Sequence, residues 1–270
     1  MSGGLGAIVM AVIAIVVFKT PPEEALKNLT QQQGQAQQGP AKPQTEREKE
    51  IDEFVRSIKG STEEVWTNIF REKSSKYRIP KLVNYDGSTS TGTDLVADAR
   101  MGPFYLPSKE TIYIDTSFFG QMDRELGGGG DFAYAYVIAH EVGHHIQKLT
   151  GKTDFVHGQK GRISETEYNQ LSVRLELQAD FYAGVWAHHA NKAHRRTEGI
   201  DLLEEGDIEE AMSSAKAIGD DTLQKNAGRR VQPESFSHGT SEQRMRWFVK
   251  GIRSGDIKQG DTFTIDYRNL

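Results

Sequence analysis

Two histidines and a glutamate stand close together in the middle of the sequence, in the pattern His-Glu-Val-Gly-His from His140 to His144. If this segment is helical, four residues turn the chain by about 400°, so the rings of His140 and His144 lie about 40° apart on one face. Glu141 lies about 100° from His140, where its carboxylate can take a proton from a metal-bound water. The spacing therefore indicates hydrolysis by a water that a metal ion, typically Zn²⁺, activates.

A catalytic zinc ion needs a third protein ligand and an open position for water. Gln147 and Thr150 stand where a metzincin would continue with glycine and a third histidine, which excludes that class. Further along, Glu176 and Asp180 stand four residues apart in an otherwise apolar stretch. Because two buried carboxylates are costly unless they meet cations or a metal, we expect Glu176 to be the third ligand. Asp180 would then accept a hydrogen bond from a ligand imidazole.

Other interpretations of these residues stay open at this point. The histidines could belong to a buried helix without a metal, and the two carboxylates could form salt bridges, with Arg174 as a partner. His145 lies about 140° from His140, too far round to share an ion, and is expected to be structural. Five histidines compete with Glu176, but none shares a helical face with a supporting acid. They are His157, His188, His189, His194 and His238.

The metal pattern requires a helix, and the sequence around it supplies one. Asp131 follows four glycines and is a natural N-cap, and the helical pattern then runs on to Gly151, which suits the residue just past a helix end. Two further helices have capping boxes at their starts, one at Ser164 and Glu167 and one at Thr240 and Gln243. The first of these two helices carries both carboxylates.

The C-terminal segment adds a candidate catalytic residue. His238 stands just before the last of these predicted helices, where it could donate to the oxyanion of a tetrahedral intermediate. The alternative is that it only fixes the turn. Arg244, on the helix itself, is a candidate partner for an acid such as Asp180 or Asp220.

The rest of the folded part reads as helices and then strands. Apolar residues at helical spacing from Glu46 to Lys73 are interrupted at residues 59–62, which predicts two helices, the second capped by Ser61 and Glu64. Residues 79–119 have a composition typical of strands and turns, and the predicted strands include PKLVNY, MGPFYL and ETIYIDTSFF. Strands followed by helices indicate an α+β domain, with a small sheet and a mainly helical C-terminal part, over residues 46–270.

The N-terminus has a different composition. Residues 1–18 carry no charge, and Leu5 to Phe18 are apolar apart from Gly6, which predicts a transmembrane anchor at residues 1–19. A cleaved signal peptide is the rival, although the basic start and small-residue cleavage site are missing. Residues 20–45 are rich in Gln and Pro and predict a disordered linker. We expect a single-pass protein of the cell membrane with its catalytic domain outside; Lys19 sets this orientation only weakly.

Overall composition argues against nucleic-acid binding and excludes a thiolate metal site. The formal net charge of −5 gives no basic surface for binding nucleic acid. The chain has no cysteine, so any metal must be bound by imidazole and carboxylate groups.

Six segments together resemble the gluzincins, and more closely the YpfJ-like bacterial family of neutral zinc metallopeptidases. They are GPFYLP, IYIDTSFF, GDFAYAYVIAHEVGHHIQ, SVRLELQADFYAGVWAHH, GDIEEAM with AIGDD, and ESFSHGTSEQRMRWF. The resemblance implies a zincin-like fold, zinc at His140, His144 and Glu176, and Glu141 as the catalytic group. It also implies that the strand ETIYIDTSFF lies along the cleft, where an extended peptide could add to its edge. The alternative is an interior strand with both edges paired.

The sequence departs from the family's usual pattern in one respect. Cysteine is usual where this chain has Leu106, Phe181 and Gly260, so any cross-link at those positions is absent.

We therefore predict a membrane-anchored zinc endopeptidase that acts on peptide or protein substrates, with Glu141 as general base. One alternative is a zinc-stabilised, non-catalytic binding or scaffold protein of the cell envelope, although such a site has no need of Glu141. Another is an envelope protein with a core of histidine-bearing helices and no metal. The sequence does not predict an oligomeric state.

Overall fold

The computed structural model describes residues 45–98, 101–120, 131–199 and 231–270, with short stretches at 202–203, 206–209, 211 and 219–226. The predicted membrane segment and the predicted linker, apart from Thr45, lie outside these residues. Within the described part of the chain, no helix is both long enough and apolar enough to cross a membrane.

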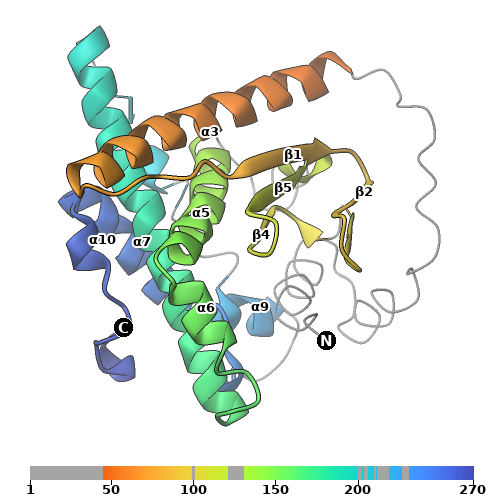
Figure 1. Ribbon diagram of the computed structural model, residues 1–270, viewed down its shortest axis with the longest axis vertical. Coiled ribbons are helices and arrows are strands. Elements are labelled where there is room, and N and C mark those ends of the chain that lie inside the picture. The colour runs from red at the N-terminus through yellow and green to blue at the C-terminus, as the bar shows by residue number, and fades with distance from the viewer. Residues whose placement is uncertain are drawn as a thin grey trace.

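Helices make up most of the described structure, and Figure 1 shows α3 lying across α5, with α7 running beside both α5 and α10. This agrees with the predicted small sheet and mainly helical C-terminal part. The α-helices are α3 (Glu46–Glu72), α5 (Asp131–Leu149), α6 (Lys152–His157), α7 (Glu165–Glu198), α9 (Asp220–Asn226) and α10 (Ser241–Ser254). Short 3-10 helices follow at η2 (Pro233–Ser235), η3 (Ile257–Gly260) and η4 (Tyr267–Asn269).

The prediction of two helices between residues 46 and 73 is wrong, because α3 is continuous. Gly60 lowers helix propensity but does not break the helix, since contacts on both sides hold it. The hydroxyl of Thr62 donates to the Lys59 carbonyl, and Lys59 also pairs with Glu63. Ser61 is not an N-cap; its hydroxyl accepts a hydrogen bond from the Trp186 indole of α7.

The sheet consists of three short strands in the order β1-β5-β4, and the three segments predicted as strands form it. β1 (Lys81–Tyr85) lies parallel to β5 (Thr111–Asp115), and β4 (Phe104–Leu106) lies antiparallel to β5 on its other side. A separate antiparallel pair joins β2 (Ser88–Ser90) to β3 (Val96–Asp98). Because β5 is the central strand, the expectation that a peptide adds to its edge is wrong; β4 is the neighbour that lies next to α5.

Local sequence signals fix the ends of the long helices. Gly151 follows the end of α5 in the left-handed conformation with φ of 77°, as predicted for the residue past a helix end. Two of the three predicted capping boxes are present, and the one at Ser61 and Glu64 is not. Ser164 and Glu167 start α7, and Thr240 and Gln243 start α10. Each of these two boxes is set by residues only a few positions apart, whereas Ser61 and Glu64 have the same spacing inside a continuous helix.

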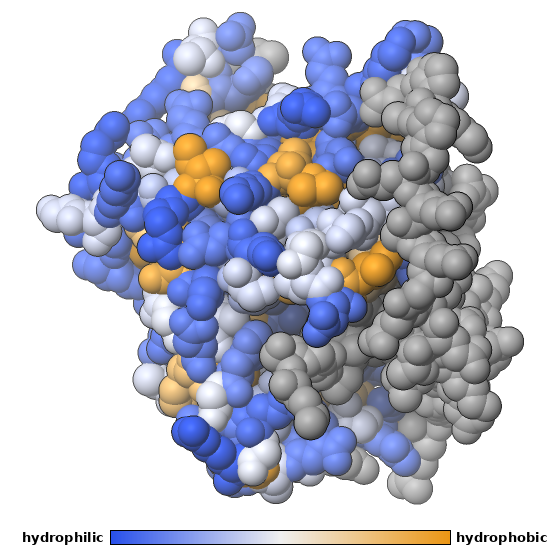
Figure 2. Space-filling model, turned by 45° about the vertical axis from the view of Figure 1, so that its right-hand side comes forward, coloured by the Kyte–Doolittle hydropathy of each residue, from blue (hydrophilic) through white to orange (hydrophobic). Residues whose placement is uncertain are grey.

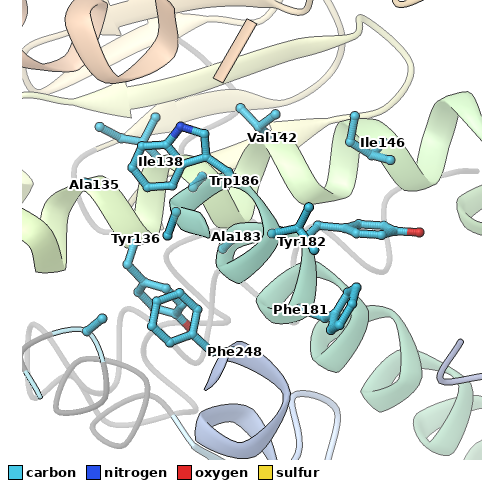
Figure 3. Close-up of a cluster of buried hydrophobic side chains, with 14 of the residues drawn as sticks. Ala135, Tyr136, Ile138, Val142, Ile146, Phe181, Tyr182, Ala183, Trp186 and Phe248 are labelled. Atoms are coloured by element: carbon cyan, nitrogen blue, oxygen red, sulfur yellow. The ribbon is translucent and has the colours of Figure 1, made fainter. Parts of the chain in front are cut away.

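Aromatic and aliphatic side chains of α5, α7 and α10 form the main core (Figure 3). Tyr136 of α5 meets Phe248 of α10 edge to face, with ring centroids 4.9 Å apart. Phe181 of α7 packs against Gly260 of η3, where an added Cβ would stand 2.4 Å from the ring. Phe181 and Gly260, two of the three positions where the family resemblance implies cysteine, are thus in contact.

The face shown in Figure 2 is mostly hydrophilic, with small and separate hydrophobic areas. Among the described residues, the large hydrophobic side chains exposed to solvent are scattered along the chain. They are Ile79, Val96, Phe155 and Leu202. Isolated residues of this kind are ordinary on a surface that faces water.

Candidate metal centre

Two close helix crossings bring the predicted site residues together. Gly143 of α5 faces Ala179 of α7, and a Cβ added to Gly143 would stand 2.8 Å from the Ala179 carbonyl oxygen. The two histidines of the motif stand three residues before and one residue after Gly143, and the two carboxylates hold the same positions around Ala179. The crossing of small residues therefore sets imidazoles against carboxylates on both sides of one contact. A second crossing, of Gly184 with Gly251, brings α10 against α7 in the same way.

Glu176 places one carboxylate oxygen against each histidine ring. Its Oε2 lies 3.3 Å from His140 Nε2, and its Oε1 lies 3.5 Å from His144 Nε2. Ligand atoms about 2.0–2.2 Å from a tetrahedral zinc ion lie about 3.3–3.5 Å from one another. The distances between these three groups, and their nitrogen and oxygen chemistry, fit a zinc ion.

His140 is oriented by a buried network on α7 and α10. Its Nδ1 lies 2.7 Å from Asp180 Oδ1, and Asp180 also accepts from the Tyr136 hydroxyl and from two nitrogens of Arg244. The imidazole donates from Nδ1, which leaves Nε2 to face Glu176. Burial alone would lower the pKa of His140, but the Asp180 carboxylate outweighs burial and raises this pKa to about 9. Asp180 thus accepts from the His140 imidazole and has Arg244 as its cationic partner, and its role beside a metal ligand stays a prediction.

His144 is oriented by an amide instead of a carboxylate. Its Nδ1 lies 2.9 Å from Gln147 Oε1, and the Gln147 amide nitrogen donates in turn to the carbonyl of Leu175 on α7. The amide oxygen can only accept, so Nδ1 carries the proton and Nε2 faces Glu176. Burial, without a neighbouring acid as close as Asp180, lowers the pKa of His144 to about 4. The two rings therefore present the same atom to the site but differ in basicity.

The proposed salt bridge between Arg174 and the buried carboxylates is absent. Arg174 donates to the backbone carbonyls of Thr262 and Ile265 and holds the C-terminal segment. Burial would raise the pKa of Glu176, but its interactions with His144 and His140, including a hydrogen bond from His140, outweigh burial and lower it. Glu176 is therefore an anion held between two histidines.

Glu141 is buried beside this cluster, with 8% of its surface exposed. Burial raises the pKa of its carboxyl to about 7, while the charge of His140 and a hydrogen bond from the backbone of Tyr105 on β4 act to lower it. One ligand atom each from His140, Glu141 and His144 lie within 4.8 Å of one another. A carboxyl with a pKa near neutrality in this position is suited to exchanging protons with a group at the site.

His238 is held in place by Asp220 at the start of α9. One Asp220 oxygen accepts from the backbone amides of Ser237, His238 and Gly239, and the other lies 3.1 Å from His238 Nδ1. Burial would lower the pKa of His238, but the Asp220 carboxylate outweighs burial and raises it. The charges of His238 and Glu176 influence each other, so this ring lies within electrostatic reach of the cluster.

The remaining histidines have other contacts or lie outside the cluster. His145 bonds to Tyr105 and to the Arg78 carbonyl, as expected of a structural residue. His188 and His189 bond to backbone carbonyls at the end of α10. In the part of the chain that the structure describes, the one group compact enough for a metal contains His140, Glu141 and His144. Glu176, His157 and His194 are outside this group, and of these three Glu176 lies 3.3 and 3.5 Å from the His140 and His144 rings.

Comparison with known families gives a zinc peptidase family. The sequence profile of the family described as "Putative neutral zinc metallopeptidase" matches residues 1–263. The chain belongs to this family. It is 43% identical to the Escherichia coli protein named "Uncharacterized protein YpfJ", over 97% of this chain and 88% of the relative. It is also 39% identical to an uncharacterized protein of Mycobacterium tuberculosis, over 70% of this chain and 64% of the relative. No solved structure matches the chain.

Sequence reasoning missed three contributors to the site. Gln147 was noted only as a residue that excludes another class, although its position three residues after His144 places it on the same helical face. Tyr136 stands four residues before His140, which is also a same-face position. The backbone of Tyr105 gives no sequence signal, because its contact with Glu141 depends on how β4 packs against α5.

Proposed function

We propose that this protein is a zinc-dependent endopeptidase of the gluzincin type, with a zincin-like fold. The observation that carries the proposal is the position of Glu176, whose two oxygens lie 3.3 and 3.5 Å from the Nε2 atoms of His140 and His144. Family membership supports zinc as the metal and hydrolysis as the class of reaction. The finer statement, cleavage inside peptide chains, rests on the ligand set and on Glu141.

The different roles that we propose for Glu176 and Glu141 follow from the groups around each carboxylate. Glu176 is strongly acidic because imidazoles face it, so it is suited to remain an anionic ligand. For Glu141 burial outweighs the charge of His140 and brings the pKa to about 7, where a carboxyl can both accept and release a proton. We therefore assign His140, His144 and Glu176 as ligands and Glu141 as general base.

A bound zinc ion would supply a Lewis acid that makes water nucleophilic near neutral pH. Glu141 takes the proton that the attacking water loses and then passes it to the amide nitrogen, so that the C–N bond breaks and a neutral amine leaves. His238 donates its Nδ1 proton to Asp220, and its raised pKa favours the protonated ring, in which Nε2–H is also a donor. That second donor would stabilise the carbonyl oxygen as it becomes negative.

The proposal includes attachment to a membrane through residues 1–19. Its support is the sequence, because residues 1–18 carry no charge and are largely apolar. Fractionation of cells that express the full chain tests this part separately. We expect the protein in the membrane fraction and its release by detergent but not by high salt; recovery in the soluble fraction would contradict it.

The catalytic part is tested by comparing the full-length protein, in detergent, with Glu141→Gln. We expect about one zinc ion per chain in both proteins and cleavage of an unfolded protein substrate only by the wild type. Loss of a positioned general base costs about 10²–10⁴-fold in rate. Glu198→Gln, an exposed position near the end of α7, is the matched control and should leave zinc content and rate unchanged.

Two results would contradict the assignment. Equal cleavage by wild type and Glu141→Gln would exclude Glu141 as the base. Stoichiometric zinc in the wild type without cleavage of any peptide or unfolded protein would instead favour the zinc-stabilised binding protein.

A further inference from the structure

His145 is a buried polar residue to which the proposed reaction assigns no role. It follows the metal motif directly, is wholly removed from solvent, and makes hydrogen bonds with both ring nitrogens. Its Nε2 lies 2.6 Å from the carbonyl oxygen of Arg78, and its Nδ1 lies 2.9 Å from the hydroxyl of Tyr105. The rings of Tyr77 and Tyr105 meet the imidazole edge to face, so its orientation is fixed by packing as well.

The partners determine where the protons lie. A backbone carbonyl can only accept, so Nε2 of His145 carries a hydrogen and donates to Arg78. In the neutral ring Nδ1 is then an acceptor, and the Tyr105 hydroxyl donates to it. The Tyr105 hydroxyl thus donates to His145, and His145 donates to the carbonyl of Arg78, which precedes β1 in the chain. These two bonds tie β4 to α5 and to the start of the sheet.

The same tyrosine contacts Glu141 with its backbone. Side chains alternate along a strand, so Phe104 stacks on Tyr113 on one face while Tyr105 points to α5 on the other. Glu141 and His145 stand four residues apart and share one face of α5. Tyr105 therefore holds two successive turns of the helix, with its hydroxyl on His145 and its backbone N–H on the Glu141 carboxylate.

The strand that carries this amide is short. β4 is three residues long and pairs with β5 over three positions. A displacement of about 1 Å at a catalytic group can cost up to about 100-fold in rate, so a short strand beside a general base benefits from a separate anchor. The phenol-to-imidazole bond supplies such an anchor one helical turn from Glu141.

We infer that Tyr105 and His145 are positioning residues, which hold the backbone amide of β4 against the Glu141 carboxylate. This inference rests on the proposed function, because it takes Glu141 as the general base. His145 acts through Tyr105 and does not touch the reacting atoms.

Tyr105→Phe tests the inference with a minimal change, since it removes one oxygen and keeps the ring contacts. Tyr113→Phe is the matched control, because this hydroxyl donates to the Thr91 carbonyl and lies on the opposite face of the sheet. We expect Tyr105→Phe to lower kcat about tenfold, the equivalent of one lost hydrogen bond, with zinc content unchanged. Exchange of the β4 amides with deuterium should become faster. Tyr113→Phe should change neither quantity.

A double-mutant comparison tests whether the two residues act together. His145→Asn should lower kcat by a similar factor, and the double variant with Tyr105→Phe should be no slower than the slower single variant. Unchanged kcat in Tyr105→Phe, or additive losses in the double variant, would overturn the inference. If the wild type binds zinc but cleaves nothing, the proposed function fails, and amide exchange still decides whether Tyr105 anchors β4; unchanged exchange would overturn the anchor.

Discussion

Arg244 of α10 and Asp180 of α7 form a bidentate ion pair in the interior of the protein, with nitrogen–oxygen distances of 2.8 and 2.9 Å. Their side chains are 2% and 0% exposed. The Asp180 carboxylate also accepts from His140, so the pair connects a C-terminal helix to a predicted zinc ligand. A helix that follows the metal motif by almost a hundred residues thus contributes to the orientation of that motif.

Arg244→Met should destabilise the protein strongly, because it leaves the buried Asp180 carboxylate without its cationic partner. Breaking one side of a buried ion pair costs about 3–5 kcal/mol. For a domain of this size that corresponds to a fall in Tm of about 6–20 °C, which thermal unfolding would measure. Arg246→Met is the control, since Arg246 is exposed on the same helix and its loss should change stability by less than about 0.5 kcal/mol. Equal shifts in both variants would contradict the role of the pair.

The features that could be predicted from the sequence are those that depend on the spacing of nearby residues. The capping boxes, the left-handed Gly151 and the two histidines on one face of α5 all depend on residues at most a few positions apart. Asp180 was also predictable, because a carboxylate four residues from another in an apolar stretch needs a buried partner. Gln147 could have been found by the same reasoning.

The remaining features depend on contacts between distant segments. No pattern specified that Arg244 would meet Asp180 and not Asp220, because the choice depends on how α10 crosses α7. The central place of β5 was missed for the same reason, since strand order depends on pairing partners far along the chain. Gly60 was misread because its low helix propensity costs only about 1 kcal/mol, which the packing of α3 outweighs.

Substitution of two helical glycines should have opposite effects. A Cβ on Gly184 would stand 2.2 Å from the Phe248 carbonyl, so Gly184→Ala must push α10 away from α7. A Cβ on Gly60 meets no atom within 4 Å, so Gly60→Ala should stabilise α3 by up to about 1 kcal/mol. Thermal unfolding should show a lower Tm for the first variant and an equal or higher Tm for the second. A neutral Gly184→Ala would mean that the two helices are not in backbone contact there.

Loss of Gln147 should weaken zinc binding although this residue is not a proposed ligand. Its amide oxygen fixes the proton on Nδ1 of His144, and removal of such an outer partner typically costs about 10–100-fold in metal affinity. Gln147→Met keeps most of the side-chain volume and removes the acceptor. Competition with a chromophoric chelator would measure the change, and Gln159→Met, at a half-buried position beyond α6 and outside the cluster, is the control. An unchanged affinity would show that the tautomer of His144 is fixed in another way.

Zinc affinity should rise with pH, because zinc must displace protons from the apoprotein. The pKa of His140 is raised to about 9, so this ring is protonated at neutral pH and must lose a proton to bind. The pKa of His144 is lowered to about 4, so that ring is already neutral. Between pH 7.5 and 8.5 we expect about one proton released per zinc ion, which makes the apparent affinity rise about tenfold per pH unit.

Below pH 7 zinc binding should release a second proton. Glu141, with a pKa of about 7, is then protonated in the apoprotein, and zinc would drive its ionisation. The slope of log affinity against pH should therefore steepen from about one towards two between pH 7 and pH 5. Glu141→Gln removes the second proton, so its slope should stay near one over the whole range. Calorimetry in two buffers of different ionisation enthalpy counts these protons directly. An affinity independent of pH would contradict the protonated His140, and equal slopes in both proteins below pH 7 would contradict the titration of Glu141 beside the metal.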